Sequence, residues 1–291
     1  MKFVALGGGH GTAVTLRALR ALSSDVTGIV SVADDGGSTG RLRAMLNVAA
    51  VGDLRKCLGA LADPKNALAQ AFEHRFSVGE LEGHTVGNLL LVGLIESTGN
   101  LELAVDAVAT ALGVSGTILP ASRDGVVLQA SHEFGITRGQ TAVARQAGIH
   151  FLSLDPPLAP APPRALRALE EADVIVIGPG SLYTSVLAAC VVPQINSALA
   201  LSAARKIYVA NLRPEKPETI GLSLQDHVDA LRAHGVDPTD VLVDAHSQFA
   251  QQACSLHTII TALSGRNPLV HDVSKLTGAV LDAVQTKPER F

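Results

Sequence analysis

The sequence predicts an α/β fold: a Rossmann-like parallel sheet in three layers, with a small β-rich insertion. Short apolar runs alternate with helical segments along the chain, and two of the runs end in glycine-rich segments, at residues 7–12 and 34–41. An apolar run that ends in glycines is typical of a buried strand followed by a loop at the carboxyl edge of a sheet. Ligands of open α/β sheets bind at that edge.

The composition of the 291-residue chain supports the same fold class. Hydrophobic residues make up 47% of the chain, aromatic residues only 3%, and tryptophan is absent. We therefore expect a large aliphatic core, as in a parallel sheet that is buried on both faces. The net charge of −4 and the lack of basic runs argue against a protein dedicated to binding nucleic acid.

The cysteines and the apolar stretches predict a cytoplasmic protein. Cys57, Cys190 and Cys254 are isolated from one another and lack the spacing of metal ligands, which fits structural roles in a reducing compartment. The chain enters its first predicted strand directly, so we expect no signal peptide. Gly, Asp or Pro interrupts each apolar stretch early, so we expect no membrane span.

The amino-terminal part reads as a strand, a helix and a second strand, followed by four helices. Residues 3–6 form the first strand, and Leu16, Leu19 and Leu22 mark one face of a helix over residues 12–23. The second strand covers residues 27–33, which implies a right-handed parallel crossover. The four helices share amphipathic or apolar patterning and cover residues 53–62, 67–76, 86–99 and 101–112. The helix over 86–99 is so apolar that we expect it to be buried all round.

The rest of the chain predicts a small insertion and a second α/β block within one domain, residues 1–291. Residues 114–154 contain short β-prone segments, including 117–119, 126–128 and 141–144, which suggest a small antiparallel insertion. The second block is expected to contain a helix over 164–171, strands over 174–177, 206–210 and 240–243, and a helix over 223–234. Ser223 and Asp226 form a capping-box pattern at the start of that last helix.

The first glycine-rich segment predicts an anion site. Its candidate phosphate-binding residues are Gly8, Gly9, His10, Gly11 and Thr12. Glycines let the backbone approach an anion, and the following helix presents free N–H groups and the positive end of its dipole. The segment matches neither the G-x-G-x-x-G dinucleotide fingerprint nor a P-loop. The alternative is a plain tight turn.

The second glycine-rich segment combines carboxylates with phosphate-binding groups. Asp34 and Asp35 are candidates for ribose, sugar or acceptor contacts, and they are also the candidate ligands of a Mg²⁺ ion, although no metal site is assigned. Asp34 follows the first glycine loop at about the distance where an acidic residue often meets a ribose. Candidate phosphate ligands in the same loop are Gly37, Ser38, Thr39 and Arg41. The alternative is that one aspartate caps the next helix.

Two helix starts add polar candidates for the sugar or acceptor side. Asp53 is either an N-cap or a site residue. Arg55 in the same first turn opposes the helix dipole, which indicates a nearby anion. His84 and Asn88 are four residues apart and share a helix face at the start of the apolar helix. We expect both side chains to line the site.

A third strand-loop-helix segment follows the strand over 174–177. Its candidate phosphate-binding residues are Gly178, Gly180, Ser181, Leu182 and Thr184. Ser181 lacks the G-x-S-x-G context of a nucleophile elbow, so it is not assigned as a nucleophile; it is also able to cap its helix. Asn211, at the end of the strand over 206–210, is a further candidate for ribose or sugar contacts.

Six motifs in a fixed order resemble the YvcK/CofD-like family, and in particular its gluconeogenesis factor branch. They are GGGHGT, VADDGGSTGRLR, GDLRKCL, HRF followed by GHTVGNLL, ADVIVIGPGSLYTSV, and PET-x-G-x-x-x-x-DH, and they cover most of the chain between residues 3 and 234. The resemblance implies a CofD-like Rossmann fold with the ligand across the carboxyl ends of the strands.

The two branches of this family imply different functions. The YvcK branch implies a cytoplasmic protein that binds UDP-sugars, notably UDP-N-acetylglucosamine, and is linked to cell shape and cell-wall synthesis during gluconeogenic growth. The CofD branch implies a Mg²⁺-dependent transferase that moves a phospholactyl-type group from a nucleotide diphosphate to a deazaflavin. In that branch the loop that matches Asp34 and Asp35 lies near the metal and the acceptor.

The chain departs from the common family pattern at three places. His10 replaces a threonine, Ala188-Ala189 stands where many relatives carry Pro-Asn, and Val270 stands where an arginine is frequent. The last two changes remove an amide and a phosphate clamp beside a nucleotide-sugar site. They bear on the identity and affinity of the ligand.

We therefore expect a UDP-sugar-binding regulatory protein, because several anion cradles occur without an evident nucleophile or base relay. The competing hypothesis is the CofD-like transferase, which the two aspartates favour and the scarcity of aromatic residues for a deazaflavin pocket disfavours. An NAD-binding oxidoreductase is a weaker third hypothesis, because the dinucleotide fingerprint fails. The apolar carboxyl half makes a homodimer plausible.

Overall fold

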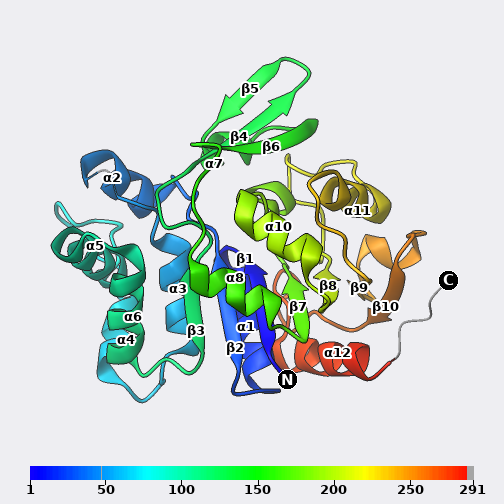
Figure 1. The fold of residues 1–291 in the computed structure, drawn as a ribbon, viewed down its shortest axis with the longest axis horizontal. Coiled ribbons are helices and arrows are strands. Elements are labelled where there is room, and N and C mark those ends of the chain that lie inside the picture. The colour runs from blue at the N-terminus through cyan, green and yellow to red at the C-terminus, as the bar shows by residue number, and fades with distance from the viewer. Residues whose placement is uncertain (47, 287–291) are drawn as a thin grey trace.

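The computed structural model describes residues 1–46 and 48–286, and within them the main feature is a seven-stranded parallel sheet (Figure 1). Its strands are β1 (Phe3–Gly7), β2 (Val26–Val30), β3 (Thr117–Pro120), β7 (Val174–Ile177), β8 (Arg205–Val209), β9 (Asp240–Asp244) and β10 (His257–Thr261). Their spatial order is β10-β9-β8-β7-β1-β2-β3, with each neighbouring pair parallel. Helices flank this sheet, which confirms the predicted Rossmann-like α/β class.

The strand order reverses at β1, and this reversal positions the site. The chain proceeds from β1 to β2 and β3 on one side, and from β7 to β8, β9 and β10 on the other. In the register of β1, Gly7 lies opposite Val30 of β2, and Leu6 lies opposite Ile177 of β7. The three strands therefore end at the same edge, and the loops that follow them meet there, as ligand sites of open α/β sheets require.

The helices pack around an aliphatic core. They are α1 (Gly9–Arg20), α2 (Gly37–Leu46), α3 (Gly52–Leu61), α4 (Ala67–Glu73), α5 (Val86–Thr98), α6 (Leu101–Leu112), α8 (Pro163–Glu170), α9 (Ala188–Cys190), α10 (Pro193–Leu201), α11 (Leu224–Ala233) and α12 (Val273–Gln285). Two short helical segments are η1 (Leu182–Leu187), which is π-helical, and η2 (Gln248–Gln251). Helix α1 packs against α3 and α12, and α8 packs against α10. Gly113 ends α6 in the left-handed conformation, and Ser223 and Asp226 form the predicted capping box.

A small antiparallel sheet stands beyond the edge of the main sheet (Figure 1). It consists of β4 (Val127–His132), β5 (Gly135–Arg138) and β6 (Ile149–Asp155), in the order β5-β4-β6, with the one-turn helix α7 (Gln140–Val143) between β5 and β6. Two of the β-prone segments that the sequence placed in the insertion have a different structure from the one predicted. Residues 117–119 belong to the main sheet, because buried Ile118 and Leu119 pair with β2, and residues 141–143 are helical.

The prediction that the helix over 86–99 is buried all round is wrong. In α5 only Gly87, Asn88, Leu91 and Val92 are buried. The helix lies at one end of the molecule and packs against α4 and α6 on one side, which leaves its other side facing outward (Figure 1). Apolar content alone did not reveal how few neighbours this helix has.

Several elements were not predicted, among them α2, α10, β10 and α12. Residues 37–41 begin helix α2, where the glycines favoured a loop, because Gly37 and Gly40 have poor helix propensity. Strand β10 and helix α12 follow the last predicted strand; Leu276, Val280 and Ala283 of α12 are buried at helical spacing, a signal that would have identified it. Residue 47 and residues 287–291 of the predicted domain lie outside the described residues.

Among residues 1–46 and 48–286, no single helix has both the length and the apolar composition to cross a membrane. One bent helix pair, Leu182–Cys190 with Pro193–Leu201, passes that test by length and composition together.

Candidate functional site

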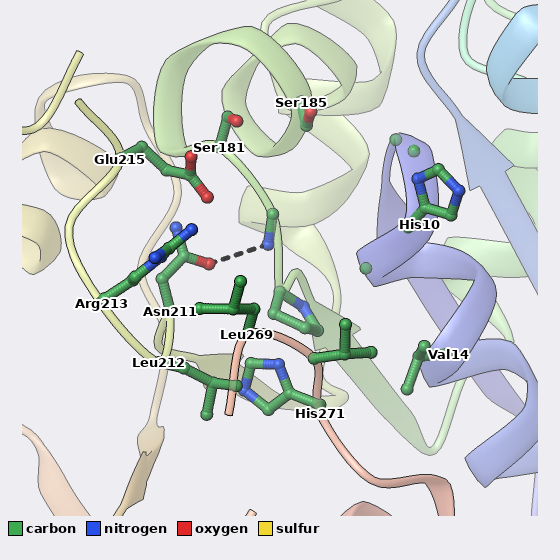
Figure 2. Close-up of a pocket in the computed structure, with 16 residues that line it drawn as sticks. His10, Val14, Ser181, Ser185, Asn211, Leu212, Arg213, Glu215, Leu269 and His271 are labelled. Carbon is green, nitrogen blue, oxygen red and sulfur yellow. Dashed lines mark hydrogen bonds between the residues drawn. The ribbon is translucent and has the colours of Figure 1, made fainter. Parts of the chain in front are cut away.

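A cavity of about 330 Å³ opens where β1, β7 and β8 end (Figure 2). Four segments build its walls: the loop from β1 into α1, the loop from β7 into η1, the segment after β8, and the segment before α12. The lining residues are Gly8, Gly9, His10, Gly11, Val14, Pro179, Gly180, Ser181, Ser185, Asn211, Leu212, Arg213, Glu215, Leu269, Val270 and His271. The site thus lies at the point where the strand order reverses.

The first wall is the uncapped start of helix α1. Its N-cap is Gly8, which offers no side chain to the free N–H groups of the first turn, and no acidic residue occupies that turn. These N–H groups and the helix dipole favour an anion. Gly11 lets this turn approach the next loop closely, because a Cβ there would lie 2.0 Å from the carbonyl oxygen of Pro179.

The second wall is the β7–η1 loop, which Asn211 supports from the end of β8. The Asn211 Oδ1 accepts a hydrogen bond of 3.0 Å from the amide of Gly180 (Figure 2). The Asn211 side chain is 5% exposed, yet its Nδ2 has no partner within the described residues. An unpaired buried donor costs free energy unless a ligand or water accepts from it. Asn211 therefore has one donor left for a ligand.

The far wall of the cavity carries the ionisable side chains of Arg213 and Glu215, and His271 lines the cavity from the segment before α12. Arg213 and Glu215 follow Asn211 along the segment after β8, and both line the cavity (Figure 2). Burial raises the pKa of Glu215, and the nearby Arg213 charge partly offsets that rise. Burial lowers the pKa of His271 to about 4, so its ring is neutral at pH 7, and its Nε2 has no partner among the described residues.

Glu218 fixes the start of η1 from the segment after β8. Its carboxylate accepts hydrogen bonds from the amide of Tyr183 at 2.6 Å, and from the amide and hydroxyl of Thr184 at 3.3 Å and 2.8 Å. Burial raises the pKa of Glu218. These N–H groups would otherwise be free to bind an anion. Predicted phosphate ligand Thr184 is thus occupied by a protein carboxylate, and Leu182 beside it is fully buried.

Asp53 lies beside the glycine loop, and its charge acts on Asp34. The Asp34 Oδ1 accepts a hydrogen bond of 2.9 Å from the amide of Gly36. Burial, and secondarily the charge of Asp53, raises the pKa of Asp34. Asp53 accepts a hydrogen bond of 2.9 Å from Lys56, and its Oδ2 lies 2.6 Å from the point where a Cβ of Gly8 would be. Asp53 therefore borders the first wall.

Asp35 has a different role from Asp34. Its Oδ1 accepts hydrogen bonds from the amide and the hydroxyl of Thr141, at 2.8 Å and 2.7 Å. These bonds connect the start of α2 to α7 of the small sheet. Asp35 is thereby a link between two parts of the fold.

Ser38, His84 and Asn88 form a buried cluster between α2 and α5. The Asn88 Nδ2 donates to the Ser38 hydroxyl at 3.0 Å, and that hydroxyl lies 2.9 Å from the His84 Nδ1. Burial, and then the charges of Arg41 and Arg75, lowers the pKa of His84. The predicted pair His84 and Asn88 thus meets, but around Ser38 and not in the cavity.

Comparison with known proteins decides the family. The sequence profile described as "2-phospho-L-lactate transferase CofD" matches residues 3–287. The chain belongs to the CofD family. This CofD-family chain is 40% identical over 236 residues to the "Gluconeogenesis factor" of Bacillus subtilis, which covers 80% of this chain and 74% of that protein. A relative from Nostoc sp. is 43% identical over 235 residues, so the match spans about half, 52%, of that protein's length.

A solved structure has the same fold. The crystal structure of a protein from Bacillus halodurans, described as a member of the UPF0052 family, superposes with a TM-score of 0.88 at 37% identity. The superposition covers 96% of this chain and 98% of the other. The resemblance of this CofD-family chain to the YvcK/CofD-like family, inferred from its motifs, is thereby confirmed.

The cavity of this CofD-family protein collects part of the predicted site. The predicted residues that line it are Gly8, Gly9, His10, Gly11, Gly180, Ser181 and Asn211. The predicted residues outside its lining are Thr12, Asp34, Asp35, Gly37, Ser38, Thr39, Arg41, Asp53, Arg55, His84, Asn88, Gly178, Leu182 and Thr184. Thr12 donates its hydroxyl to the Gly8 carbonyl. The anion expected beside Arg55 is the carboxylate of Glu73.

A metal in this CofD-family site has two carboxylates available. Within the described part of the chain, no three His, Cys, Asp or Glu side chains are grouped to hold a metal ion. Asp34 and Asp53 nevertheless offer oxygen donors, and oxygen is the ligand that Mg²⁺ prefers. Burial first, and then the charge of Asp53, raises the pKa of Asp34, and a divalent cation would relieve the repulsion between the two carboxylates. The two residues thus fit Mg²⁺ if substrate phosphates and water complete its coordination.

Sequence analysis did not assign nine of the lining residues to the site, although the family resemblance placed Val270 beside a nucleotide-sugar site. The lining residues that were not among the predicted site residues are Val14, Pro179, Ser185, Leu212, Arg213, Glu215, Leu269, Val270 and His271. Arg213 and Glu215 follow the strand that ends beside Asn211, so the rule that polar residues after a strand reach the site would have found them. Leu269 to His271 come from a distant segment, and no local pattern places them here.

Proposed function

We propose that this CofD-family protein binds a nucleotide sugar of the UDP-N-acetylglucosamine type and acts as a regulatory gluconeogenesis factor. One observation carries the proposal: the cavity combines an uncapped helix start with a buried, unpartnered amide donor at Asn211. The free N–H groups of α1 suit the phosphates of a nucleoside diphosphate. The Asn211 Nδ2 then donates to the same ligand.

The remaining lining suits the uncharged parts of such a ligand. Val14, Leu212, Leu269 and Val270 line the cavity and offer apolar surface for a base. Pockets for small ligands commonly combine apolar walls with a few convergent polar groups. A cytoplasmic location, a link to cell shape and cell-wall synthesis, and a homodimeric state belong to the same proposal, and the resemblance to the YvcK branch supports them.

Isothermal titration with UDP-N-acetylglucosamine tests the proposal through Asn211→Asp. Aspartate keeps an oxygen for the Gly180 amide but replaces the free donor with a negatively charged oxygen that cannot donate to the ligand. We expect the wild type to release heat on binding and the variant to bind at least about tenfold more weakly, a loss of about 1.4 kcal/mol.

The matched control is Asn100→Asp, because Asn100 caps α6 outside the cavity lining and aspartate is an equally good cap. This control adds the same charge and is expected to bind as the wild type does. Absence of heat from the wild type at millimolar ligand would remove the proposal. Equal affinity of the wild type and Asn211→Asp would remove the role of the cavity.

The second candidate function is a CofD-like, Mg²⁺-dependent transferase, and the carboxylates of Asp34 and Asp53, of which Asp53 lies beside the glycine loop, favour it. Held between these carboxylates and the phosphates, Mg²⁺ would stabilise charge on the transferred group. The assay follows transfer of a phospholactyl group from a nucleoside diphosphate to a deazaflavin. If this function is correct, EDTA or Asp34→Asn abolishes turnover and exposed Asp25→Asn does not. Lack of turnover with Mg²⁺ and both substrates excludes it.

A further inference from the structure

The wall formed by Asn211, Arg213 and Glu215 differs in its chemistry from the wall on the opposite side of the cavity. The opposite wall is made of glycine backbone and the start of α1, whose N–H groups attract anions. Glu215 instead brings a carboxylate to the lining, and no salt bridge to it occurs among the described residues. Like charges repel, so phosphates bound in this cavity lie at the N–H groups of the glycine wall and away from Glu215, although Arg213 attracts anions on the Glu215 side and Asp53 repels them at the border of the glycine wall.

The group that meets Glu215 must donate hydrogen bonds. An ionised carboxylate only accepts them, and its two oxygens are placed to accept from two neighbouring hydroxyls. The Asn211 Nδ2, which precedes Glu215 on the same segment, is a donor without a partner among residues 1–46 and 48–286. A vicinal diol supplies two O–H donors and also oxygen acceptors. A diol could therefore donate to the Glu215 carboxylate and accept from the Asn211 Nδ2.

We propose that Glu215, together with Asn211, binds a vicinal diol of the ligand and so fixes its orientation, with the phosphates at the glycine wall. This inference rests on the proposed nucleotide-sugar function and adds a specificity-determining residue to it. Two parts of the ligand carry such a diol: the ribose, through its 2′ and 3′ hydroxyls, and the sugar ring, through its 3 and 4 hydroxyls. Figure 2 shows Glu215 and Asn211 on the same side of the cavity.

The test measures affinities of Glu215→Ala and Glu215→Gln for UDP-N-acetylglucosamine, UDP and 2′-deoxy-UDP, by calorimetry in EDTA. Glu133→Ala is the matched control, because Glu133 is exposed on the small sheet and its removal changes net charge equally. We expect Glu215→Ala to weaken binding of UDP-N-acetylglucosamine roughly ten- to a hundredfold, as for a hydrogen bond to a charged group. Glu215→Gln keeps one acceptor and is expected to lose less.

The three ligands separate the two diols. If the ribose is bound, Glu215→Ala weakens UDP as much as UDP-N-acetylglucosamine, and wild-type protein binds 2′-deoxy-UDP correspondingly weakly. If the sugar is bound, the loss is confined to UDP-N-acetylglucosamine. Either pattern supports the proposal.

Other results overturn it in distinguishable ways. Wild-type binding with no loss in Glu215→Ala removes the role of Glu215 and leaves the proposed function standing. A loss that appears only when Mg²⁺ replaces EDTA assigns Glu215 to a metal instead of a diol. A wild type that binds none of the three ligands removes the proposed function, and this inference falls with it.

Discussion

Several buried polar side chains have a nitrogen or oxygen atom without a hydrogen-bond partner among the described residues, and His227 is the clearest case outside the cavity. Its side chain is fully buried; its Nδ1 lies 3.0 Å from the hydroxyl of Tyr208, and its Nε2 has no partner within the described residues. Burial lowers the pKa of His227 to about 4. Protonation of this ring in the folded state would leave a charge buried without a counterion.

We expect the stability of the protein to fall as pH falls from 7 to 5. Between the unfolded pKa of 6.5 and the folded pKa of about 4, the unfolded state binds more protons at His227. Acid therefore favours unfolding over this range, and above pH 6.5 the effect is absent. At pH 5 the loss from this residue is about 2 kcal/mol, and urea unfolding at several pH values measures it.

His227→Asn is the informative variant for that experiment, because its side-chain oxygen accepts from Tyr208 where Nδ1 does, and it does not titrate. His271, whose pKa burial also lowers to about 4, contributes to the slope in both proteins. The variant should therefore show a shallower pH dependence, whatever its absolute stability. Parallel curves for the two proteins would refute the assignment.

At the scale of elements, the start of η1 depends on a residue far along the chain. Glu218 accepts hydrogen bonds from three donors on Tyr183 and Thr184, and it is 4% exposed. Its segment also contributes Asn211, which supports the Gly180 amide. The segment after β8 thus holds the β7–η1 loop in the form that lines the cavity.

Removal of this carboxylate should loosen η1. Glu218→Ala leaves three buried donors without an acceptor, so we expect the free energy of unfolding to fall by roughly 2–4 kcal/mol. Hydrogen exchange at the amides of residues 182–187 should accelerate in this variant. Glu218→Gln, which keeps one side-chain oxygen, should fall between it and the wild type.

Glu133→Ala serves here as the surface control, because it removes a carboxylate that is exposed. Its exchange rates over residues 182–187 are expected to equal those of the wild type. The same slow exchange in Glu218→Ala would show that packing of Leu182 and Val186 fixes η1 without the carboxylate.

At the scale of the whole molecule, the cavity exists because the order of the strands reverses at β1. Its walls come from residues 8–14, 179–185, 211–215 and 269–271, which are far apart in the sequence. The first three follow β1, β7 and β8, which are neighbours in the sheet. The fourth precedes α12, which packs against α1 and so returns the end of the chain to the site. The small sheet is tied to the same edge through Asp35 and Thr141.

Local patterns predicted the strands and helices that have strong local signals. The strand over 174–177 and the helix over 101–112 match β7 and α6 residue for residue, because a short aliphatic run and an Asn-to-Gly capped helix are each specified locally. Helix α2 was missed because two glycines weaken its local signal. Strand β3 was misassigned to the insertion because nothing in residues 117–119 tells which sheet they join.

The sequence by itself determined the α/β class and the family, and it singled out Gly8 to Gly11, Gly180 and Asn211, which line one cavity. Strand-ending glycines and ordered motifs are local properties, and a parallel sheet brings strand ends to one edge. Only the tertiary structure decided that Asp35 and Thr184 contact other protein groups, that His84 and Asn88 meet around Ser38, and that Glu215 faces the glycine wall. Those outcomes depend on which side chains, distant in the sequence, the packing of the fold brings within hydrogen-bonding distance of each polar atom.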